Sequence, residues 1–412
     1  MDELRRRLGR SDAVIVGVGS MIGAGVFSVW GPAAEAAGGY LLIGLVIAGI
    51  VALANATSSA QLAAQHPESG GTYVYARLRL SPFWGHVAGW GFVVGKTASC
   101  AAMALTIGAY VWPDQARSVA TVAVCAILAI NLGGLERTVA VTRVLLAVSG
   151  ATLLIVVLGS LLGGDSSMMV LSSEIDVTAF GVLRSAGLTF FAFAGYARIA
   201  TLGEEVRDPA STIPWAVPRA LGAVLVVYLI VAATALARVP AGALAVSDAP
   251  LALVVDVGQF SGLGWIVDVG AVVACLGVLL NLIPGVSRTA LAMARRHELP
   301  TALARIDTKR QHPVIAELVV TFAVLVCVQF FTLTSAIAVS GLAVLTYYAI
   351  TNAAALRLAP SERRWPRWLA WIGLIGCCAL AISLPTRAML GGVSVLVMGI
   401  VARQLVPADR RD

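Results

Sequence analysis

Four glycines lie within nine residues of the first apolar stretch, in GVGSMIGAGVF: Gly17, Gly19, Gly23 and Gly25. Each glycine weakens a helix by about 1 kcal/mol relative to alanine, so we expect the helix to be interrupted here. The interruption would leave the backbone N–H groups of Ala24 and Gly25 free at the start of a half-helix, where they suit a carboxylate. The pattern is also compatible with tight helix packing, because Gly19 and Gly23 form a GxxxG pair.

A second candidate interruption lies in the aromatic-rich segment from Phe191 to Tyr196. An unwound chain would leave the carbonyl groups of Phe191, Ala192 and Ala194 free to accept hydrogen bonds from an ammonium group. A single aromatic run of this kind is typical of helix packing. Two interruptions at corresponding positions of the two halves of a chain are what inverted-repeat membrane transporters require.

One lysine stands inside an apolar stretch, where a charge needs an explanation. Lys96 follows Trp84 by 12 residues, which places it about 18 Å along a helix and near the middle of a bilayer. Burying its ammonium group there costs a few kcal/mol. Two interpretations stay open: a proton-carrying residue that couples transport to a gradient, or a structural cation held by helix ends. Arg198, near the inner end of its own stretch, is interpreted as a gate or a loop partner and not as a substrate ligand.

The elements that must position these groups are membrane helices. The chain has 412 residues, of which 59% are hydrophobic and 12% are charged. That is about half the charge of a soluble chain, so an ordinary soluble enzyme is excluded. Stretches poor in charge predict twelve spans, near residues 12–36, 39–64, 84–112, 117–133, 141–163, 179–202, 215–238, 262–287, 313–331, 334–357, 367–383 and 388–405. Eleven or ten spans are alternatives, because only a turn from Thr332 to Ser335 separates the ninth from the tenth.

The basic residues indicate how the spans are oriented. With the N-terminus inside, 23 of the 29 basic residues fall on the inner side, 4 on the outer side and 2 within spans. This asymmetry is what the positive-inside rule predicts for an even number of spans. We therefore expect a multi-pass protein of the cell inner (plasma) membrane with cytoplasmic N- and C-termini. No loop is long enough for a soluble domain, so we predict a single membrane transport domain over residues 1–412.

Four segments carry a recognisable pattern: GVGSMIGAGVF in the first span, QLAAQHPESGGTYVYAR between the second and third, FFAFAGYARIATLGEEVRDPASTIP in and after the sixth, and GVSRTALAMARRHELP after the eighth. In this order they resemble the amino acid–polyamine–organocation transporters. They cover about a fifth of the chain, between residues 17 and 300. The resemblance implies an all-α polytopic membrane protein with the leucine-transporter-like fold, in which helices 1 and 6 are broken.

The resemblance also implies how the chain is divided and where it binds. Residues 12–163 and 179–357 would form a five-plus-five inverted repeat, and residues 367–405 two additional helices. The family binds an amino acid between the broken helices and moves it by alternating access. The substrate-binding residues implied are Ile22, Gly23, Ala24 and Gly25 for the carboxylate, Phe191, Ala192 and Ala194 for the ammonium group, and Phe193 for the side-chain pocket. Tyr196 would lie near this pocket or its gate.

The sequence departs from the family pattern at several positions. Gln61 stands where the family often has glutamate, and Ala197 where an acidic residue commonly follows the aromatic residue of the sixth span. Trp215 stands where the family usually has the arginine of an isoleucine–proline–arginine segment. Some proton-coupled relatives carry a lysine in the fifth span, but residues 144–164 contain only uncharged side chains here. The functional interpretation of Lys96 is that it replaces this missing coupling residue.

The predicted central positions provide no carboxylate, which bears on the substrate. A cationic amino acid or polyamine would need an acidic partner in a dry pocket. Asp268, the acid most clearly inside a span, lies only about 9 Å from the outer end of that span. We therefore predict a neutral amino acid as substrate, with a cationic amino acid or polyamine transporter or exchanger as the alternative. A proton or sodium gradient would supply the driving force, and no cofactor or metal is expected.

Two other classes of membrane protein offer alternatives. An intramembrane enzyme would need a clustered nucleophile and base or metal ligands, but His66, His86, His297 and His312 all lie in or beside predicted loops. A receptor that binds an amino acid without transporting it stays open. The six cysteines all fall inside apolar stretches and are interpreted as small hydrophobic residues. The expected partners are an amino acid and the lipid bilayer, not nucleic acid, and the oligomeric state is left open.

Overall fold

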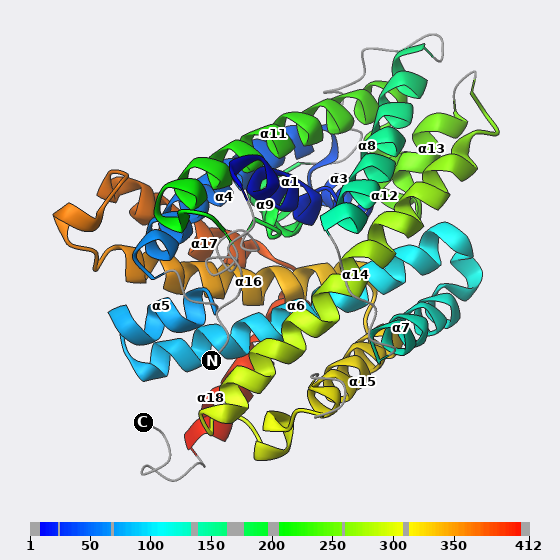
Figure 1. Ribbon diagram of the computed structural model, residues 1–412. Coiled ribbons are helices and arrows are strands. Elements are labelled where there is room, and N and C mark those ends of the chain that lie inside the picture. Colours follow the sequence, from blue (N-terminus) through cyan, green and yellow to red (C-terminus); the bar gives the residue numbers. More distant parts are fainter. Residues whose placement is uncertain are drawn as a thin grey trace.

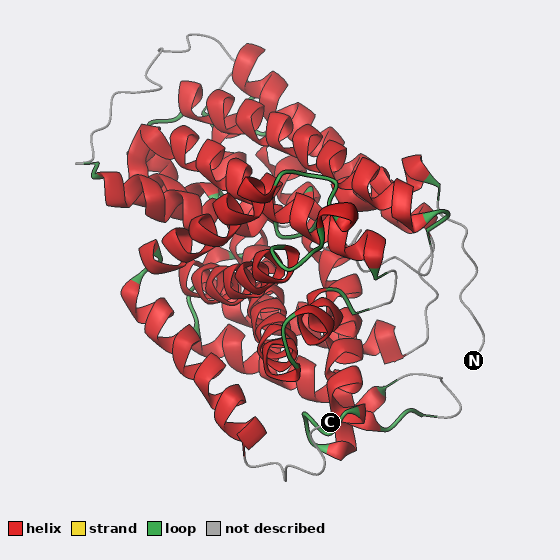
Figure 2. Cartoon of the chain, turned by 90° about the vertical axis from the view of Figure 1, so that its left-hand side faces the viewer, coloured by secondary structure: helices red, strands yellow, loops and turns green. Residues whose placement is uncertain are grey.

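The computed structural model describes residues 9–23, 25–66, 70–132, 139–162, 177–196, 206–257, 260–307 and 313–404. Every regular element in these ranges is a helix (Figures 1 and 2). The structure is therefore that of an all-α chain, as the hydrophobic pattern predicts.

The helices of the first part of the chain are α1 (Arg10–Met21), α2 (Gly25–Ser28), α3 (Trp30–Ala37), η1 (Gly38–Tyr40), α4 (Leu41–Gln65), α5 (Thr72–Arg79), α6 (Pro82–Val111), η2 (Pro113–Gln115), α7 (Ala116–Leu132) and α8 (Val139–Leu162). α6 shows how a helix of this protein begins. The Ser81 side chain accepts a hydrogen bond from the Trp84 N–H (3.4 Å), and Pro82 occupies the first helical position. Both features are typical of helix N-termini.

The helices of the second part are α9 (Ala179–Phe193), α11 (Pro209–Arg238), α12 (Ala241–Val246), α13 (Pro250–Asp256), α14 (Gly264–Arg295), η3 (Thr301–Ala304), α15 (Val314–Phe330), α16 (Leu333–Ala355), η4 (Pro360–Glu362), α17 (Arg367–Ser383) and α18 (Thr386–Gln404). The turn expected before α16 is present, and its Thr332 side chain accepts a hydrogen bond from the Ser335 N–H (3.2 Å). This cap separates α15 from α16 in an otherwise continuous apolar stretch.

Nine helical stretches within the described ranges are long and apolar enough to cross a membrane. Three shorter apolar helices, α9, α15 and α17, accompany them. The chain is therefore a multi-pass membrane protein. α9 is shorter than its expected span because it ends at Phe193, inside the second predicted interruption.

Some helix limits differ from the expected spans. The first expected span, 12–36, is divided into α1, α2 and α3. Of these, α2 ends at Ser28 and α3 begins at Trp30. The eighth, expected over 262–287, continues to Arg295, because the residues that follow the apolar stretch are good helix formers. α12 and α13 were not expected, since the apolar runs that form them are much too short for a span.

The interrupted helices lie between two groups of packed helices. α4 packs against α9, α11 and α17, and α6 packs against α14, α15 and α16. α16 also contacts α4, so it joins the groups, and Figure 1 shows α6 and α16 side by side. α1 packs against α11, and α2 contacts both α6 and α9. This arrangement places both interruptions in the interior of the molecule.

The outer helices carry apolar side chains on their exposed faces. Phe322 and Phe330 of α15 are 68% and 80% exposed, and Ile382 of α17 is 66% exposed. A water-soluble protein rarely exposes so many large apolar groups. These faces are suited to contact lipid tails.

Candidate functional site

The first helix is interrupted where the glycine pattern predicts it. α1 ends at Met21 and α2 begins at Gly25, and Ile22 and Gly23 between them are buried. The Gly23 N–H donates a hydrogen bond to the Met21 carbonyl (2.8 Å). The first N–H groups of α2 have no acceptor within that helix, as at every helix start. Ala24, also expected to bind a carboxylate, lies outside the described residues.

The second interruption follows Phe193, the last residue of α9. Two long hydrogen bonds turn the chain: the Ala194 N–H donates to the Phe191 carbonyl, and the Tyr196 N–H donates to the Phe193 carbonyl, both at 3.3 Å. These bonds span three residues instead of four, so the regular helix stops here. Arg198, expected to act as a gate, lies outside the described residues.

The two interruptions contact each other through glycines. A methyl group added to Gly25 would lie 2.7 Å from the Cα atom of Ala192. One added to Gly195 would lie 2.1 Å from the carbonyl oxygen of Ser20. Backbone atoms cannot rotate away as side chains do, so only glycine permits this close approach. The structure thus brings together residues that the sequence predicts for the carboxylate and for the ammonium group.

A tyrosine from α11 links the two interruptions. The Tyr228 hydroxyl lies 2.6 Å from the Met21 carbonyl oxygen and 3.2 Å from the Ala192 carbonyl oxygen, and donates to both. The Tyr228 ring is fully buried and packs against the rings of Phe193, at 5.2 Å between centroids, and Trp30, at 6.3 Å. Tyr228 therefore holds the end of α1 against the end of α9. The apolar sequence around Tyr228 carries no local pattern that predicts this role.

Lys96 reaches the second interruption. Its Nζ atom donates a hydrogen bond to the Ala194 carbonyl oxygen (3.3 Å), and the Tyr348 hydroxyl of α16 donates to the same oxygen (3.4 Å). The Tyr348 ring stacks on that of Tyr196, with 4.9 Å between centroids. Lys96 is therefore at the candidate site, whereas Tyr348 was missed because the tenth span carries no local signal that separates it from its neighbour Tyr347.

The electrostatics of the site are dominated by Lys96. Its side chain is buried, with 9% exposed, and no carboxylate of the described residues forms an ion pair with it. Within the same residues, no group of three histidine, cysteine, aspartate or glutamate side chains could hold a metal ion. The polar groups available to a ligand at this site are backbone N–H and carbonyl groups, tyrosine hydroxyls and one ammonium group.

A buried ionic cluster lies at the ends of α5 and α14, which the sequence predicts to be cytoplasmic. Glu298 accepts hydrogen bonds from Arg77 and from the Tyr73 hydroxyl (3.0 Å), and its carboxylate lies 3.5 Å from Nδ1 of His86. Burial, followed by the negative charge of Glu298, raises the pKa of Tyr73 above its ordinary value. Nε2 of His86 is 3.0 Å from the Gly399 carbonyl oxygen, which connects the cluster to α18.

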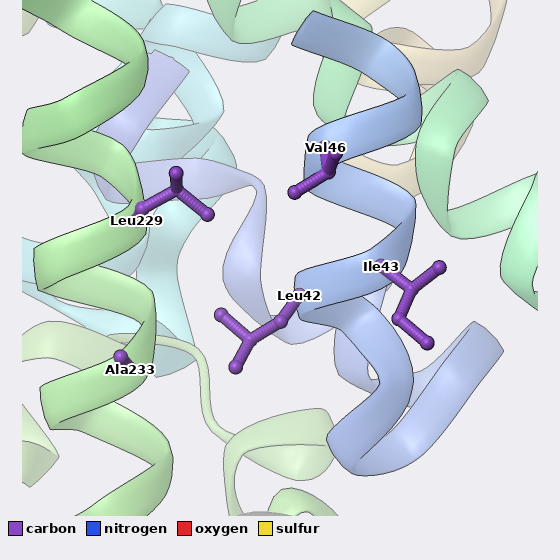
Figure 3. A pocket seen from close by; sticks show the side chains of 5 residues that line it. All are labelled: Leu42, Ile43, Val46, Leu229 and Ala233. Atoms are coloured by element: carbon purple, nitrogen blue, oxygen red, sulfur yellow. The ribbon is translucent and has the colours of Figure 1, made fainter.

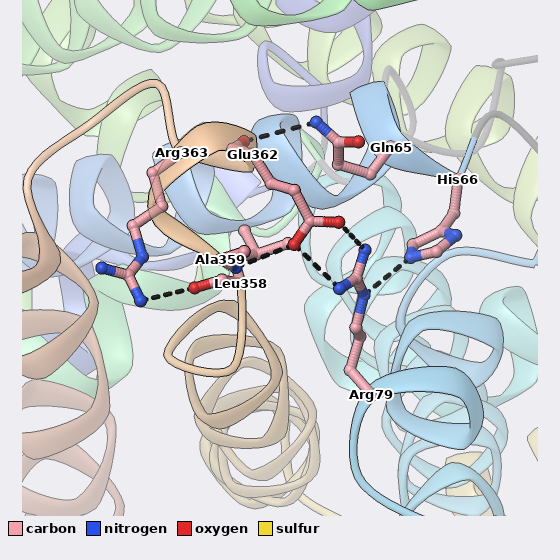
Figure 4. A network of polar contacts seen from close by, with 7 residues as sticks. All are labelled: Gln65, His66, Arg79, Leu358, Ala359, Glu362 and Arg363. Carbon is pink, nitrogen blue, oxygen red and sulfur yellow. Dashed lines mark hydrogen bonds and ion pairs between the residues drawn. The ribbon is translucent and has the colours of Figure 1, made fainter.

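A second polar network joins the end of α4 and α5 to η4 (Figure 4). The Arg79 guanidinium donates two hydrogen bonds to the carboxylate of Glu362, at 2.6 and 2.9 Å, and a third to Nε2 of His66, at 2.9 Å. Gln65 donates to the Glu362 carbonyl (3.3 Å). The hydrogen bonds from Arg79 are the main reason why the pKa of Glu362 is lowered.

An apolar groove lies between α4 and α11, lined by Leu42, Ile43, Val46, Leu229 and Ala233 (Figure 3). Ile43 and Val46 are 49% and 41% exposed. The groove offers aliphatic side chains and no charged group, so it suits lipid chains and not a zwitterion. The candidate functional site is therefore the pair of interruptions in the interior.

These features define a multi-pass helical membrane protein with a polar interior site built from interrupted helices. The chain belongs to the amino acid permease family, whose model matches residues 8–401. This places it in the amino acid–polyamine–organocation superfamily that its four motifs resemble, and it is a transporter of amino acids, not an enzyme.

Three relatives illustrate the range of similarity. An uncharacterized transporter of Mycobacterium tuberculosis is 52% identical over 404 residues, which is 97% of this chain and 91% of the relative. The branched-chain amino acid permease of Bacillus subtilis is 27% identical over 338 residues, covering 76% of this chain and 72% of the relative. Cationic amino acid transporter 6 (chloroplastic) of Arabidopsis thaliana is 25% identical over 459 residues, covering 100% of this chain and 78% of the relative.

Proposed function

We propose that this permease carries a neutral amino acid across the cytoplasmic membrane by alternating access, driven by a proton gradient. The observation that carries the proposal is the contact between the two interruptions, where Gly25 meets Ala192. Backbone donors from one helix and backbone acceptors from the other face one interior region. A zwitterion needs both kinds of group, and this pair of interruptions would supply both.

The substrate would bind when the two interruptions separate. Its carboxylate would take the first N–H groups of α2, at Gly25 and the residues beside it, with Gly23 and Ile22 lining the turn. Its ammonium group would take carbonyl oxygens at the end of α9, at Phe191, Ala192 and Ala194. Because Gly25 and Ala192 are in contact, a substrate between them would require this contact to open.

The order of the helices supports a five-plus-five inverted repeat. The interrupted helix α1–α3 would begin the first half, over residues 12–163, and the interrupted helix α9 the second, over residues 179–357. α17 and α18 would then be the two additional helices. Alternating access would move the two groups of helices, packed around α4 and α6, relative to each other. With both termini cytoplasmic, α5 and the end of α14 would face the cytoplasm.

Lys96 supports coupling to protons. It is buried near the site, and the described residues provide no carboxylate ion pair to hold its charge permanently. A lysine in such surroundings can gain and lose a proton as the site opens to either side.

The substrate class follows from the charge at the site. A positive side chain on the substrate would meet the Lys96 ammonium group, so a neutral amino acid is favoured. The relative from Bacillus subtilis is named for branched-chain amino acids, which are neutral. The Arabidopsis relatives are named for cationic amino acids, which keeps a cationic substrate or an exchanger as the rival.

Uptake by purified protein in liposomes tests the proposal. Labelled leucine, alanine and lysine would be offered with proton and sodium gradients imposed independently, and protein-free liposomes would serve as control. We expect saturable uptake of leucine or alanine that an inward proton gradient increases. Uptake of lysine alone, or uptake that follows only the sodium gradient, would contradict the substrate or the coupling assigned here.

A further inference from the structure

We infer that the Lys96 ammonium group occupies the place of the substrate's own ammonium group at the Ala194 carbonyl, so that an incoming amino acid must displace it. This inference rests on the proposed function. It gives Lys96 a role in substrate binding that is separate from the coupling to protons.

The hydrogen bonds at Ala194 carry the inference. A carbonyl oxygen has two lone pairs and accepts two good hydrogen bonds. At Ala194 both are used, by Nζ of Lys96 at 3.3 Å and by the hydroxyl of Tyr348 at 3.4 Å. A substrate ammonium group that approaches this oxygen therefore meets two donors, and it can form a short hydrogen bond there once one of them has left.

The neighbouring carbonyl groups also have donors already. The Ala192 oxygen accepts from the Tyr228 hydroxyl (3.2 Å), and the Phe191 oxygen accepts from the Ala194 N–H (3.3 Å). Lys96 is the only donor among these that has the same chemistry as the ligand, an ammonium group with three N–H donors. It also sits on a flexible chain of four carbons, whereas the Tyr228 ring is packed between Phe193 and Trp30.

Charge makes the two occupants exclude each other. Two ammonium groups on one carbonyl oxygen would repel each other strongly in a buried site. Among the described residues, no carboxylate forms an ion pair with Lys96 that would offset this repulsion. The site therefore holds either the lysine or the substrate ammonium group.

This role differs from that of a structural cation in a way that a binding assay can detect. If Lys96 only stabilises the end of α9, its removal weakens substrate binding or leaves it unchanged. If Lys96 competes with the substrate, its removal strengthens binding. The expected gain is about tenfold in Kd if the lysine holds the carbonyl in about nine-tenths of the unliganded molecules.

Equilibrium binding to purified protein in detergent provides the first test, with tritiated leucine, alanine and lysine as probes. Lys96→Met removes the charge and keeps most of the side-chain volume, and we expect its Kd for the bound probe to fall about tenfold. Lys96→Arg keeps a cation and should show no such gain. An unchanged or higher Kd in Lys96→Met, or an equal gain in Lys96→Arg, would overturn the inference.

Chemical replacement of the missing side chain provides the second test. Its outcome does not depend on whether the substitution at Lys96 stabilises or destabilises the protein. Lys96→Ala lacks three carbons and the ammonium group, which n-propylammonium supplies as a free molecule. We expect n-propylammonium to compete with the bound amino acid in Lys96→Ala much more strongly than in the wild type, and 1-propanol, which has no charge, to have no effect. Equal competition in both proteins, or none in Lys96→Ala, would contradict the inference.

These experiments distinguish failure of the proposed function from failure of the inference about Lys96. If the wild type binds none of the three probes in detergent and transports none in liposomes, the proposed function is wrong and the inference falls with it. If the wild type binds leucine or alanine, but Lys96→Met gains no affinity and n-propylammonium does not compete in Lys96→Ala, the proposed function stands and only the inference is wrong.

Discussion

At the scale of single residues, the site is built from backbone groups held by a few side chains. Gly25 permits the contact between α2 and α9, Tyr228 connects the ends of α1 and α9, and Lys96 and Tyr348 bind the Ala194 carbonyl. None of these side chains is acidic. This arrangement supports the proposed substrate, a zwitterion, whose charges would match backbone donors and acceptors without a further carboxylate.

Replacing Gly25 with leucine should abolish uptake while leaving membrane insertion intact. Even a methyl group at Gly25 would lie 2.7 Å from the Cα atom of Ala192, so the larger side chain would fill the binding region or keep the interruptions apart. The measurement is uptake in liposomes, with the amount of inserted protein determined in parallel. Gly222→Leu in α11 is the matched control, because nothing lies within 4 Å of the position that its Cβ would take. Uptake preserved in Gly25→Leu would remove the carboxylate site from this position.

Lys96→Ala should weaken accumulation against a gradient more than it weakens exchange of labelled for unlabelled substrate. In the proposed mechanism, accumulation needs a proton to move with the substrate, whereas exchange needs only that the loaded site can change sides. Both rates would be measured in liposomes over a range of pH. If both are unchanged at every pH, Lys96 is a structural cation.

At the scale of elements, α5 takes part in two polar clusters that connect it to the end of α14, to α6 and to η4. Glu298, after α14, binds Arg77 and Tyr73 of α5 and lies beside His86 of α6. Arg79, at the end of α5, binds Glu362 of η4. The first cluster is buried, since the Glu298 side chain is 3% exposed, while the second is more open, with Glu362 26% exposed. Only the buried cluster should contribute substantially to stability.

Glu298→Ala should therefore destabilise the protein by roughly 3–5 kcal/mol, because it leaves the positive charge of Arg77 without its partner in a buried site. Thermal unfolding in detergent would measure the effect. Glu362→Ala removes a comparable pair that water can replace, so its loss should be much smaller. Equal losses of stability in the two variants would mean that burial of the Glu298 cluster does not make it more stabilising than the exposed pair.

The sequence predicted the elements of the site better than their contacts. The glycines around Gly23 and the aromatic run at Phe193 locate both interruptions, because glycine content and local pattern decide where a helix weakens. Tyr228 and Tyr348 could not be predicted, since they matter only because α11 and α16 pack against the interruptions. The short helices α12 and α13 could not be predicted for a different reason. Each is held by tertiary contacts and has too few residues to show the hydrophobic periodicity of a helix.

At the scale of the whole molecule, the described conformation is closed at the candidate site. The interruptions touch at Gly25 and Gly195, and Tyr228 bridges them. The proposed alternating access would require these contacts to open when substrate binds and to re-form when it leaves. The helices around α4 and around α6 form two groups joined by α16, so a relative movement of the groups would open the site without unfolding either of them.

The central claim is that an amino acid binds between the two interruptions. The most direct test is a cryo-electron microscopy map of the protein in lipid nanodiscs, saturated with the amino acid that it takes up in liposomes. The account predicts ligand density between the start of α2 and the carbonyl groups of Ala192 and Ala194, with Gly25 moved away from Ala192. Ligand density elsewhere, with Gly25 still in contact with Ala192, would contradict it.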